Sequence, residues 1–342
     1  MTTQAAAQPP AALQPPAASP PEALPPEAQP PAALPPPVPA PPLAADLLPR
    51  CAFPPPGRPL CCAVSGGPDS LALLVLATAA GCEVTAVHVD HGLRPGSAGE
   101  ADVVAAAAER FGARFRAERV VVADGPNLEA RARAARFSVL PDDVATGHTM
   151  DDQAETVLIN LLRGAGTDGV AAMAPGPRHP LLGIRRADTA AVCAAAGLHP
   201  LADPSNDDDR HLRNRVRHHL LPLLADLAGR DPVPLLARQS DLARDDSSLL
   251  DGLAAEAVPD PTDADRLAAV PPALARRAVR RWLRSGHTGY PPSSAEVDRV
   301  LAVASGRAVA TELTGGRRVA RTARRLRVEP PAADGGRSGG LR

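Results

Sequence analysis

The sequence predicts an α/β fold, in which a parallel sheet carries helices on both faces, plus a smaller, mainly helical C-terminal domain. Two observations support this fold class. From residue 60, short apolar runs typical of strands alternate with helix-forming segments, and repeated strand–helix units pack as a parallel sheet covered on both sides. After about residue 220 the apolar residues recur at helical spacing instead, which indicates a second domain built from helices.

Three strands and two helices open the predicted sheet. Residues 60–64 (LCCAV) and 83–89 (EVTAVHV) are apolar enough to be buried strands. Residues 69–80 and 99–111 carry helix formers and connect each strand to the next. Residues 115–122 form the third strand.

A further helix, strand and helix complete the pattern. Residues 127–140 carry helix formers behind Asn127, which is suited to the N-cap. Residues 143–146 are expected to be a short strand, and residues 152–163 a helix that stops at Gly164. Ligands of such folds bind beyond the carboxyl ends of the strands, so the loops after the strands should converge on one edge. These loops are 65–70, 90–96 and 147–152.

Composition excludes several classes of protein. The net charge of the 342 residues is -1, so the total charge does not indicate a nucleic-acid partner, and all 37 basic residues are arginine. The 5 cysteines form no CxxC pair and are expected to be reduced, small apolar residues in a cytoplasmic protein. No apolar run reaches the roughly 18 residues of a membrane span.

Residues 1–58 are predicted to be a disordered tail rich in Pro and Ala. Its prolines often stand in pairs five residues apart, and proline neither donates a backbone hydrogen bond nor continues a helix. The α/β domain is then expected over residues 59–222, the helical domain over 223–330, and a flexible tail over 331–342.

The C-terminal domain should carry a local basic surface. In residues 275–283 the apolar positions follow helical spacing, and arginines, among them Arg276, Arg280 and Arg284, occupy the complementary face. Residues 307–328 are expected to form a hairpin that turns at Gly315-Gly316 and has an arginine-rich second arm. Arginines on one face are suited to contact phosphates, although a solvated helix face has the same pattern.

The first chemical motif is Ser65-Gly66-Gly67-Pro68-Asp69-Ser70, between the first strand and the first helix. A helix N-terminus presents unpaired N–H groups and partial positive charge, and the glycines let an anion approach the backbone. The segment therefore predicts a cradle for the pyrophosphate end of a nucleotide. The phosphate loop of common NTPases requires a Lys, and the chain has none.

The second motif is Gly147-His148-Thr149-Met150-Asp151-Asp152-Gln153-Ala154-Glu155-Thr156. Asp151 or Asp152 is expected to cap the helix, and Asp152 and Glu155 then share one helix face. Carboxylates beside a phosphate cradle favour a cation such as Mg²⁺, which binds one or two carboxylates together with phosphate oxygens. An ordinary capping box with a solvated acidic first turn has the same pattern.

Five further blocks accompany the two motifs: VDHGLR at 89–94, LLRG at 161–164, HPLL at 179–182, DPSN at 203–206 and RNRVR at 213–217. Together the motifs and blocks resemble the tRNA(Ile)-lysidine synthase family. This family belongs to the PP-loop (adenine nucleotide alpha hydrolase-like) ATP pyrophosphatases. The resemblance covers residues 60 to 222 and is loose beyond them. It implies an ATP- and Mg²⁺-dependent ligase that adenylates the wobble cytidine of a CAU-anticodon isoleucine tRNA, and then attaches L-lysine with release of AMP.

The resemblance also implies roles for individual residues. Implied to be catalytic are Asp69, Asp151, Asp152, Glu155 and His148, with Asp69 and Asp152 as metal ligands and Asp151 and Glu155 as candidates to hold the lysine amine. Implied to bind ATP are Ser65, Gly66, Gly67, Pro68, Asp69, Ser70, Asp90 and His91. Implied or expected to bind tRNA are Arg133, Arg136, Arg163, Asn206, Arg213, Asn214, Arg215, Arg276, Arg280 and Arg284.

The sequence departs from the family pattern at three positions, and it is also compatible with other functions. Phe137 replaces a Tyr, Cys193 an aromatic residue and His179 an Arg of the family pattern. The alternatives are another PP-loop enzyme, such as a tRNA thiolase or an amidating synthetase, and a non-catalytic nucleotide- or RNA-binding protein. The sequence leaves the oligomeric state open, with a homodimer as one candidate.

Overall fold

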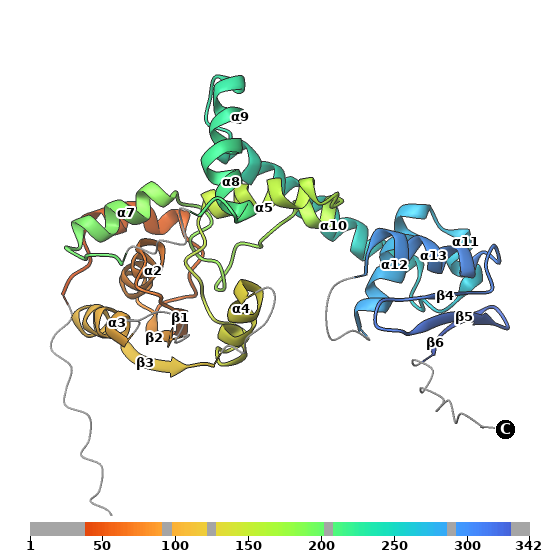
Figure 1. The fold of residues 1–342 in the computed structure, drawn as a ribbon, viewed down its shortest axis with the longest axis horizontal. Helices are drawn as coiled ribbons and strands as arrows, with labels where there is room; N and C mark the ends of the chain where they lie inside the picture. Colours follow the sequence, from red (N-terminus) through yellow and green to blue (C-terminus); the bar gives the residue numbers. More distant parts are fainter. Residues whose placement is uncertain (1–37, 91–97, 122–127, 202–207, 286–291, 330–342) are drawn as a thin grey trace, which may run out of the picture. The chain divides into compact units, whose positions relative to one another are not determined.

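The computed structural model describes residues 38–90, 98–121, 128–201, 208–285 and 292–329 (Figure 1). The expectations for residues 1–37 and for the tail 331–342 lie outside the described residues. None of the described helices is both long and apolar enough to cross a membrane.

A three-stranded parallel sheet forms the centre of the first part of the chain. Its strands β1 (Pro59–Ala63), β2 (Glu83–Asp90) and β3 (Arg114–Arg119) lie in the order β1-β2-β3. Leu60 is paired with Val84 across the first ladder, and Thr85 with Arg114 across the second.

The strand predicted over 143–146 is reduced to one parallel bridge between Ala145 and Cys62, on the side of β1 away from β2. Ala145 makes two backbone hydrogen bonds to β1, and the N–H of Thr146, which points to the opposite side, donates to the carbonyl of Arg178. In the described residues this segment therefore joins the sheet through Ala145 alone.

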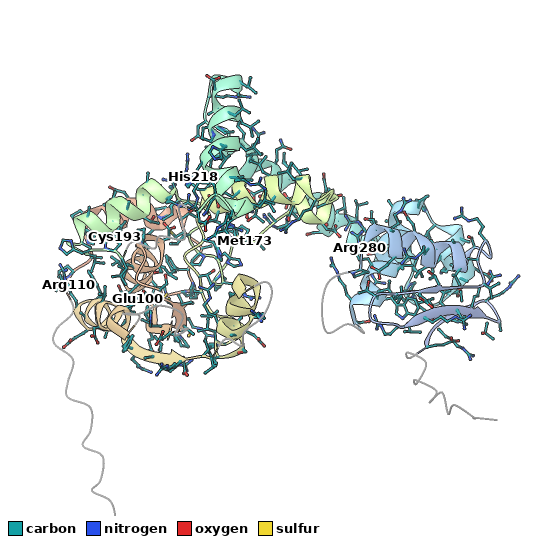
Figure 2. The ribbon with its side chains drawn as sticks, in the orientation of Figure 1. Glu100, Arg110, Met173, Cys193, His218 and Arg280 are labelled. Atoms are coloured by element: carbon teal, nitrogen blue, oxygen red, sulfur yellow. The ribbon has the colours of Figure 1, made fainter. Side chains whose placement is uncertain are left out.

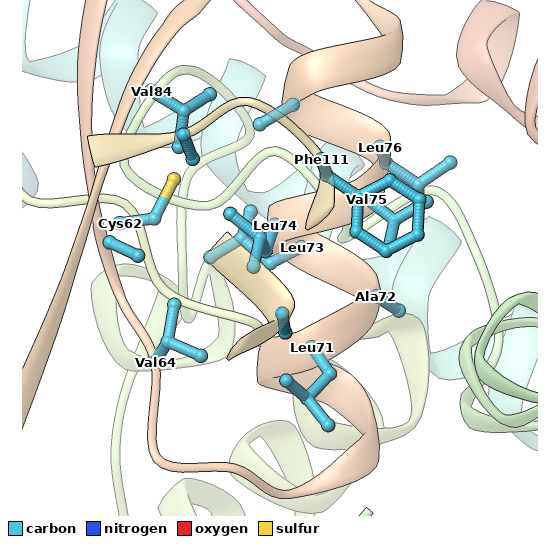
Figure 3. Close-up of a cluster of buried hydrophobic side chains, with 14 of the residues drawn as sticks. Cys62, Val64, Leu71, Ala72, Leu73, Leu74, Val75, Leu76, Val84 and Phe111 are labelled. Carbon is cyan, nitrogen blue, oxygen red and sulfur yellow. The ribbon is translucent and has the colours of Figure 1, made fainter. Parts of the chain in front are cut away.

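One face of the sheet is covered by α2 (Pro68–Ala79) and α3 (Ala98–Arg110), and α7 (Arg186–Ala195) packs on α2. The residues of α2 from Leu71 to Ala77 are fully buried, so this helix is apolar on all sides. Figure 3 shows its side chains against Cys62, Val64 and Phe111. Burial of each leucine contributes about 1.5–3 kcal/mol.

The opposite face of the sheet is covered by α4 (Leu128–Ser138). Its Phe137 packs with the buried side chains of Val87, Leu140 and Val144. Alternate residues of β1 and β2 contribute to the two clusters, as the period of a strand requires. Helices on both faces of a parallel sheet confirm the predicted fold class. Asn127, the expected N-cap, lies outside the described residues.

The prediction of a disordered tail over residues 1–58 is wrong for residues 42–50. These residues form α1 (Pro42–Leu47) and a 3₁₀ turn, η1 (Leu48–Arg50), and Ala44 and Leu47 are buried in the main core. Pro42 stands at the first helical position, where its missing N–H costs nothing. The proline-free segment 43–48 then has enough apolar residues to pack.

A group of helices follows the sheet. Their bounds are α5 (Met150–Leu162), α6 (Thr167–Val170), α8 (Leu212–Arg215), the π-helical turn η3 (Val216–Leu220), α9 (Leu221–Ala228) and α10 (Val233–Ala257). Residues of α5, η3, α9 and α10 share a small core around Ala154, Leu158 and Val216. This core fixes α5 and η3, which carry most of the charged residues of the site.

The described residues of the C-terminal part form three helices and a three-stranded antiparallel sheet. The elements are α11 (Ala264–Ala269), α12 (Pro272–Ser285), α13 (Ser294–Ala304), β4 (Ala310–Glu312), β5 (Arg318–Thr322) and β6 (Arg325–Glu329), and the strand order is β4-β5-β6. Val279, Val297 and Val319 are buried between the helices and the sheet.

The predicted hairpin has one strand more than expected. Gly315 and Gly316 do turn the chain, both with positive φ, but the expected second arm is itself a hairpin of β5 and β6. Its turn is Ala323-Arg324, with φ of 48° and 66°. Such two-residue turns normally contain Asn or Gly, so this turn has no sequence signal.

Candidate active site

The segment Ser65–Ser70 links β1 to α2 and forms a compact loop. Gly67 is the N-cap of α2 and Pro68 its first residue. The Ser70 hydroxyl donates to the carbonyl of Gly67 (2.9 Å) and accepts from the N–H of Ser65 (3.1 Å), which holds the loop in shape. Gly66 has φ of 87°, in the region that favours glycine. The loop therefore leads directly into the N-terminus of α2, as the sequence predicts.

A second glycine brings the 147–152 loop against this one. A Cβ on Gly147 would lie 2.7 Å from the Asp69 carbonyl oxygen and 3.0 Å from the backbone nitrogen of Ser70. Neither backbone atom can move away without distorting the start of α2. The two predicted motifs are therefore in direct contact.

The loops open onto a pocket of about 460 Å³. Its charged and polar lining comes from the loop, from the 146–148 segment, from β2, and from α3, α4, α5, α7 and η3. The lining includes Ser65, Asp69, Ser70, His88, Arg136, His148, Asp152, Arg186 and Arg217. Val87, Val89, Phe137 and Leu140 form an apolar part of the wall. The pocket thus has a polar end suited to phosphates and an apolar end suited to a base.

Asp69, the first candidate acid, is held by α7. It accepts a hydrogen bond from the Thr189 hydroxyl, and its other oxygen lies 3.6 Å from the Arg186 Nε. Burial raises the pKa of Asp69, the hydrogen bond from Thr189 opposes this shift, and the nearby Asp152 adds to it. A carboxylate whose ionisation is disfavoured in this way is a candidate cation ligand.

Asp152 is buried at the start of α5. The N-cap is Thr149, and neither Asp151 nor Asp152 as the sequence suggested; the backbone N–H and the hydroxyl of Thr149 both donate to Asp152 Oδ2 at 2.9 Å. The other oxygen of Asp152 accepts from Arg186 Nη2 at 3.0 Å. Burial raises the pKa of Asp152, but the charge of Arg186 and the Thr149 N–H outweigh it and lower the pKa.

Glu155, one turn further along α5, is 0% exposed. Arg217 holds it with two nitrogens, since Nε lies 2.7 Å from Oε1 and Nη2 lies 3.2 Å from Oε2. Arg186 Nη2 lies 3.2 Å from Oε1 and Arg213 Nη1 lies 3.6 Å from Oε2. Three guanidinium groups thus surround the Asp152–Glu155 pair, which we call the carboxylate pair.

Asp151 has a different set of partners. Arg185 donates to both of its oxygens, at 2.9 and 3.0 Å, and the N–H of Arg186 donates to Oδ2 at 2.8 Å. Burial raises the pKa of Asp151, but the Arg185 and Arg186 hydrogen bonds outweigh it and lower the pKa. This carboxylate ties the start of α5 to the start of α7.

His148 is oriented by the hydroxyl of Thr146. Its Nδ1 lies 2.7 Å from Thr146 Oγ1, and Nδ1 of His179 lies 2.9 Å from the same oxygen. The hydroxyl also donates to the carbonyl of Arg178 at 3.2 Å. Since it has a single hydrogen, the arrangement is satisfied when both rings carry their proton on Nδ1. His179, where the family pattern has Arg, is thus the second ring of this pair.

The remaining predicted nucleotide-binding residues are Asp90 and His91. Asp90 ends β2 and lies 3.9 Å from Arg119, and His91 is outside the described residues. His88, which the sequence analysis did not select, is buried in the same strand end and lines the pocket, with Nδ1 3.0 Å from the carbonyl oxygen of Val64. A carbonyl only accepts, so the His88 Nδ1 carries the proton.

The predicted tRNA-binding residues near the pocket separate into several environments. Arg136 lines the pocket beside Phe137, Arg213 contacts the carboxylate pair, and Arg163 and Arg215 are exposed. Asn214 is buried and donates to the carbonyl of Asp208. Arg133 lies in α4 with its side chain outside the described residues, as is all of Asn206.

The three C-terminal arginines do not form one free surface. Arg280, labelled in Figure 2, pairs with Asp168 of α6 at 3.0 Å, next to Arg277, which pairs with the same carboxylate. Arg276 pairs with Asp298 at 2.7 Å, whereas Arg284 is exposed. Asp168 accepts from Ser247 as well, so these contacts hold α6, α10 and α12 together.

Besides His88 and Arg185, sequence reasoning missed Arg186, Arg217 and Thr189. Arg186 and Thr189 belong to α7, more than 30 residues beyond the acids they contact, so no spacing rule connects them. Arg217 stood at the end of the RNRVR block and was the arginine of that block not selected. The sequence did indicate Arg217, because an arginine four residues after the selected Arg213 lies on the same helix face.

The five cysteines are partly or fully buried. Burial raises the pKa of Cys51 and of Cys193 to about 11 and also raises the pKa of Cys61, Cys62 and Cys82. Cys193 lies in α7 (Figure 2). Its Sγ donates to the carbonyl of Pro68. All five are free of disulfides. Buried, protonated thiols are poor nucleophiles, which disfavours thiolase chemistry.

Two parts of the chain match known families. Residues 47–224 match the PP-loop domain family, and residues 263–327 match the TilS substrate binding domain family. The tRNA(Ile)-lysidine synthase of Nocardia farcinica is 46% identical over 235 residues, which cover 65% of this chain and 74% of that protein. The enzyme of the same name from Mycobacterium tuberculosis is 41% identical over 281 residues, covering 75% of this chain and 86% of that protein.

Among solved structures, the U34-tRNA thiolase NcsA of Methanococcus maripaludis is similar at a TM-score of 0.44 and 16% identity. The match covers 55% of this chain and 73% of that chain.

Proposed function

This chain belongs to the tRNA(Ile)-lysidine synthase family, and we propose from that premise that it ligates L-lysine to C2 of the wobble cytidine of CAU-anticodon isoleucine tRNA. In the first step the cytidine C2 oxygen attacks the α-phosphorus of ATP, and pyrophosphate leaves. In the second step the ε-amine of lysine attacks C2, AMP leaves with the oxygen, and the amine loses a proton. The products are lysidine, AMP and pyrophosphate.

The observation that carries this proposal is the shared pocket wall. The Ser65–Ser70 loop offers N–H and hydroxyl donors to a pyrophosphate, and Arg186 and Arg217 line the same pocket. Asp152 of the carboxylate pair lines the pocket as well, and Glu155 contacts both arginines. One pocket thus holds groups for a polyphosphate anion and groups for an ammonium cation, which are the two ligands that this ligation needs.

Asp69 and Asp152 fit a Mg²⁺ ion that arrives with ATP. Asp69 contacts the Nε side of the Arg186 guanidinium and Asp152 contacts Nη2, so a cation would be accommodated between these two acids, on the Nε side, and would leave the Nη2 position beside Glu155. Within the described ranges no three His, Cys, Asp or Glu side chains are grouped as a metal site, so phosphate oxygens would complete the coordination. The metal would neutralise phosphate charge in the transition state.

The lysine amine is assigned to the carboxylate pair. Asp152 lines the pocket and Glu155 lies one turn along α5 on the same helix face, whereas Asp151 is not among the lining residues and pairs with Arg185. This geometry favours Asp152 over Asp151 as the partner of Glu155. His148, whose ring is fixed by Thr146, is the candidate to accept the proton that the amine loses.

Contacts with tRNA are assigned to arginines at the pocket and beyond it. Arg136 lies at the pocket, and Arg163, Arg215 and Arg284 are exposed and suited to backbone phosphates. We propose a cytoplasmic location, because the proposed substrates tRNA, ATP and lysine meet in that compartment.

The test uses purified protein, ATP, Mg²⁺, labelled lysine and two transcripts, isoleucine tRNA with a CAU anticodon and methionine tRNA. We expect label in the isoleucine tRNA alone, together with AMP and pyrophosphate in equal amounts. Turnover with glutamine or ammonia in the absence of RNA would instead identify an amidating synthetase. ATP binding without either product would identify a non-catalytic protein.

A further inference from the structure

Arg186 occupies the position between the anion cradle and the carboxylate pair. Its Nη2 lies 3.0 Å from Asp152 Oδ1 and 3.2 Å from Glu155 Oε1, and its Nε lies 3.6 Å from Asp69 Oδ2. One guanidinium thus contacts three carboxylates, and a single nitrogen bridges two of them. A cation between two carboxylates is the arrangement that the proposed function requires for the lysine ammonium.

Of the three arginines on the carboxylate pair, Arg186 is the one placed to leave it. Arg217 holds Glu155 with two nitrogens, which fixes its geometry. Nη1 of Arg213 lies 3.5 Å from Asp152 Oδ1 and 3.6 Å from Glu155 Oε2, and Arg213 is not among the residues that line the pocket. Arg186 lines the pocket beside Asp69, is 28% exposed, and so has room to turn toward a phosphate.

The charges of the cluster balance without a ligand. Asp69, Asp152 and Glu155 contribute three negative charges, and Arg186, Arg213 and Arg217 contribute three positive ones. A polyphosphate in the cradle adds negative charge next to Arg186. If Arg186 turns to the phosphate, the buried carboxylate pair loses a counter-ion, which is costly unless another cation replaces it.

We propose that Arg186 is a placeholder cation that couples the two substrates. It neutralises the carboxylate pair in the free enzyme, and it moves to the nucleotide phosphates when ATP binds, which uncovers the pair for the lysine ammonium. This role rests on the proposed function. It makes lysine bind well only after ATP is present, so that the amine is held beside the cytidine when the adenylate forms.

Such a coupling is reciprocal and measurable. If ATP raises the affinity for lysine by some factor, lysine raises the affinity for ATP by the same factor. Couplings between sites typically amount to about 5- to 150-fold, and we expect an effect on the order of tenfold here.

The experiment measures labelled lysine by equilibrium dialysis against the full chain, without tRNA, in the absence and presence of Mg²⁺ and α,β-methylene-ATP. In the wild type we expect the nucleotide to tighten lysine binding on the order of tenfold. In Arg186→Gln, lysine should bind without nucleotide about as tightly as it binds to the nucleotide-loaded wild type, and the nucleotide should add less than about twofold.

Arg185→Gln is the matched control. Arg185 is the neighbouring residue and also bridges to a carboxylate of α5, but that carboxylate is Asp151, outside the pair. This variant should keep the nucleotide effect of the wild type. Loss of the effect in both variants would mean that any damage to the contact between α5 and α7 abolishes it, and would overturn the role of Arg186.

The wild-type measurement is decisive even if a variant does not fold. Equal lysine affinity with and without nucleotide, in a preparation that forms lysidine, would overturn the placeholder role and leave the proposed function intact. Failure of the proposed function has a different result, because no labelled lysine would then enter isoleucine tRNA under any condition.

Discussion

The Ser65–Ser70 loop and the charge cluster around Glu155 lie on one pocket wall and are built in different ways. The loop is made from backbone, with its shape set by Gly66, Ser70 and the start of α2. The cluster is made from side chains of α5, α7, α8 and η3, held by ion pairs. A backbone site depends on space and conformation, whereas a side-chain site depends on charge balance. The two should therefore respond to different kinds of substitution.

The largest effect is expected where the cluster loses a buried charge. Glu155→Ala leaves Arg186, Arg213 and Arg217 with uncompensated positive charge, and we expect a loss of about 3–5 kcal/mol in the free energy of unfolding. Urea unfolding of the full chain measures it. A loss below about 1 kcal/mol would show that the cluster is not an interdependent network.

Asp69 belongs to both the loop and the charge cluster. Its substitution should lower the activity without lowering the stability. Asp69→Asn should lower the adenylation rate on the order of 10²- to 10³-fold, because a charged group at the phosphates is lost. The fold raises the pKa of Asp69, so the neutral amide should not reduce stability at pH 7. Pyrophosphate release and thermal unfolding, measured on one preparation, check both parts. Full activity would remove Asp69 from the site.

Gly147→Ala tests the Ser65–Ser70 loop through a steric clash alone, without changing any charge. The new Cβ would lie 2.7 Å from the Asp69 carbonyl, so we expect a loss of about 1–3 kcal/mol in stability and weaker ATP binding. Gly252→Ala in α10 is the control, because its Cβ would meet nothing within 4 Å and should stabilise the helix by about 0.5–1 kcal/mol. Equal effects of the two changes would contradict the close contact of the two loops.

The pH dependence of stability should have opposite signs for two acids. The folded pKa of Asp151 lies below its ordinary value of 3.8, so its contribution is present above pH 3.8 and is lost as the pH falls through the folded value. The folded pKa of Asp69 is raised, so its contribution is present below pH 3.8 and is lost as the pH rises. Asp151→Asn should therefore flatten the loss of stability between about pH 5 and 3, whereas Asp69→Asn should steepen it.

The smallest effect is expected among the C-terminal arginines. Arg284→Gln should reduce the salt dependence of tRNA binding by about one phosphate contact, with a change in stability within about 0.5 kcal/mol. Arg280→Gln should leave the salt dependence unchanged and lower stability, because Arg280 is paired with Asp168. Filter binding across a salt series checks both variants, and the reverse result would show that the Asp168 pair opens in the complex.

Contiguous motifs made the backbone region predictable. Ser65–Ser70 could be placed at a helix start because a glycine turn between a strand and a helix is a local pattern. Asp152 and Glu155 could be placed on one face of α5 for the same reason. Arg186 and Thr189 could not be connected with them, because α7 reaches the site through tertiary packing on α2.

Two local predictions failed for a related reason. Residues 42–50 were assigned to the tail on their proline-rich surroundings, but Ala44 and Leu47 find a core to pack on. The turn at Ala323-Arg324 has positive φ without Asn or Gly, because pairing of β5 with β6 stabilises a conformation that the residues themselves disfavour. In both segments tertiary contacts override local preference.

The sequence by itself determined the α/β class, the position of the Ser65–Ser70 loop at the start of α2, the acids that lie beside it and the resemblance to a family, because each rests on residues near one another in the chain. The tertiary structure decided which acid faces which arginine. Arg185 takes Asp151 away from the pocket, and Arg186 joins Asp69 to the carboxylate pair. Charge pairing acts over a few ångströms in space, and spacing along the chain does not reveal which side chains the fold brings within that distance.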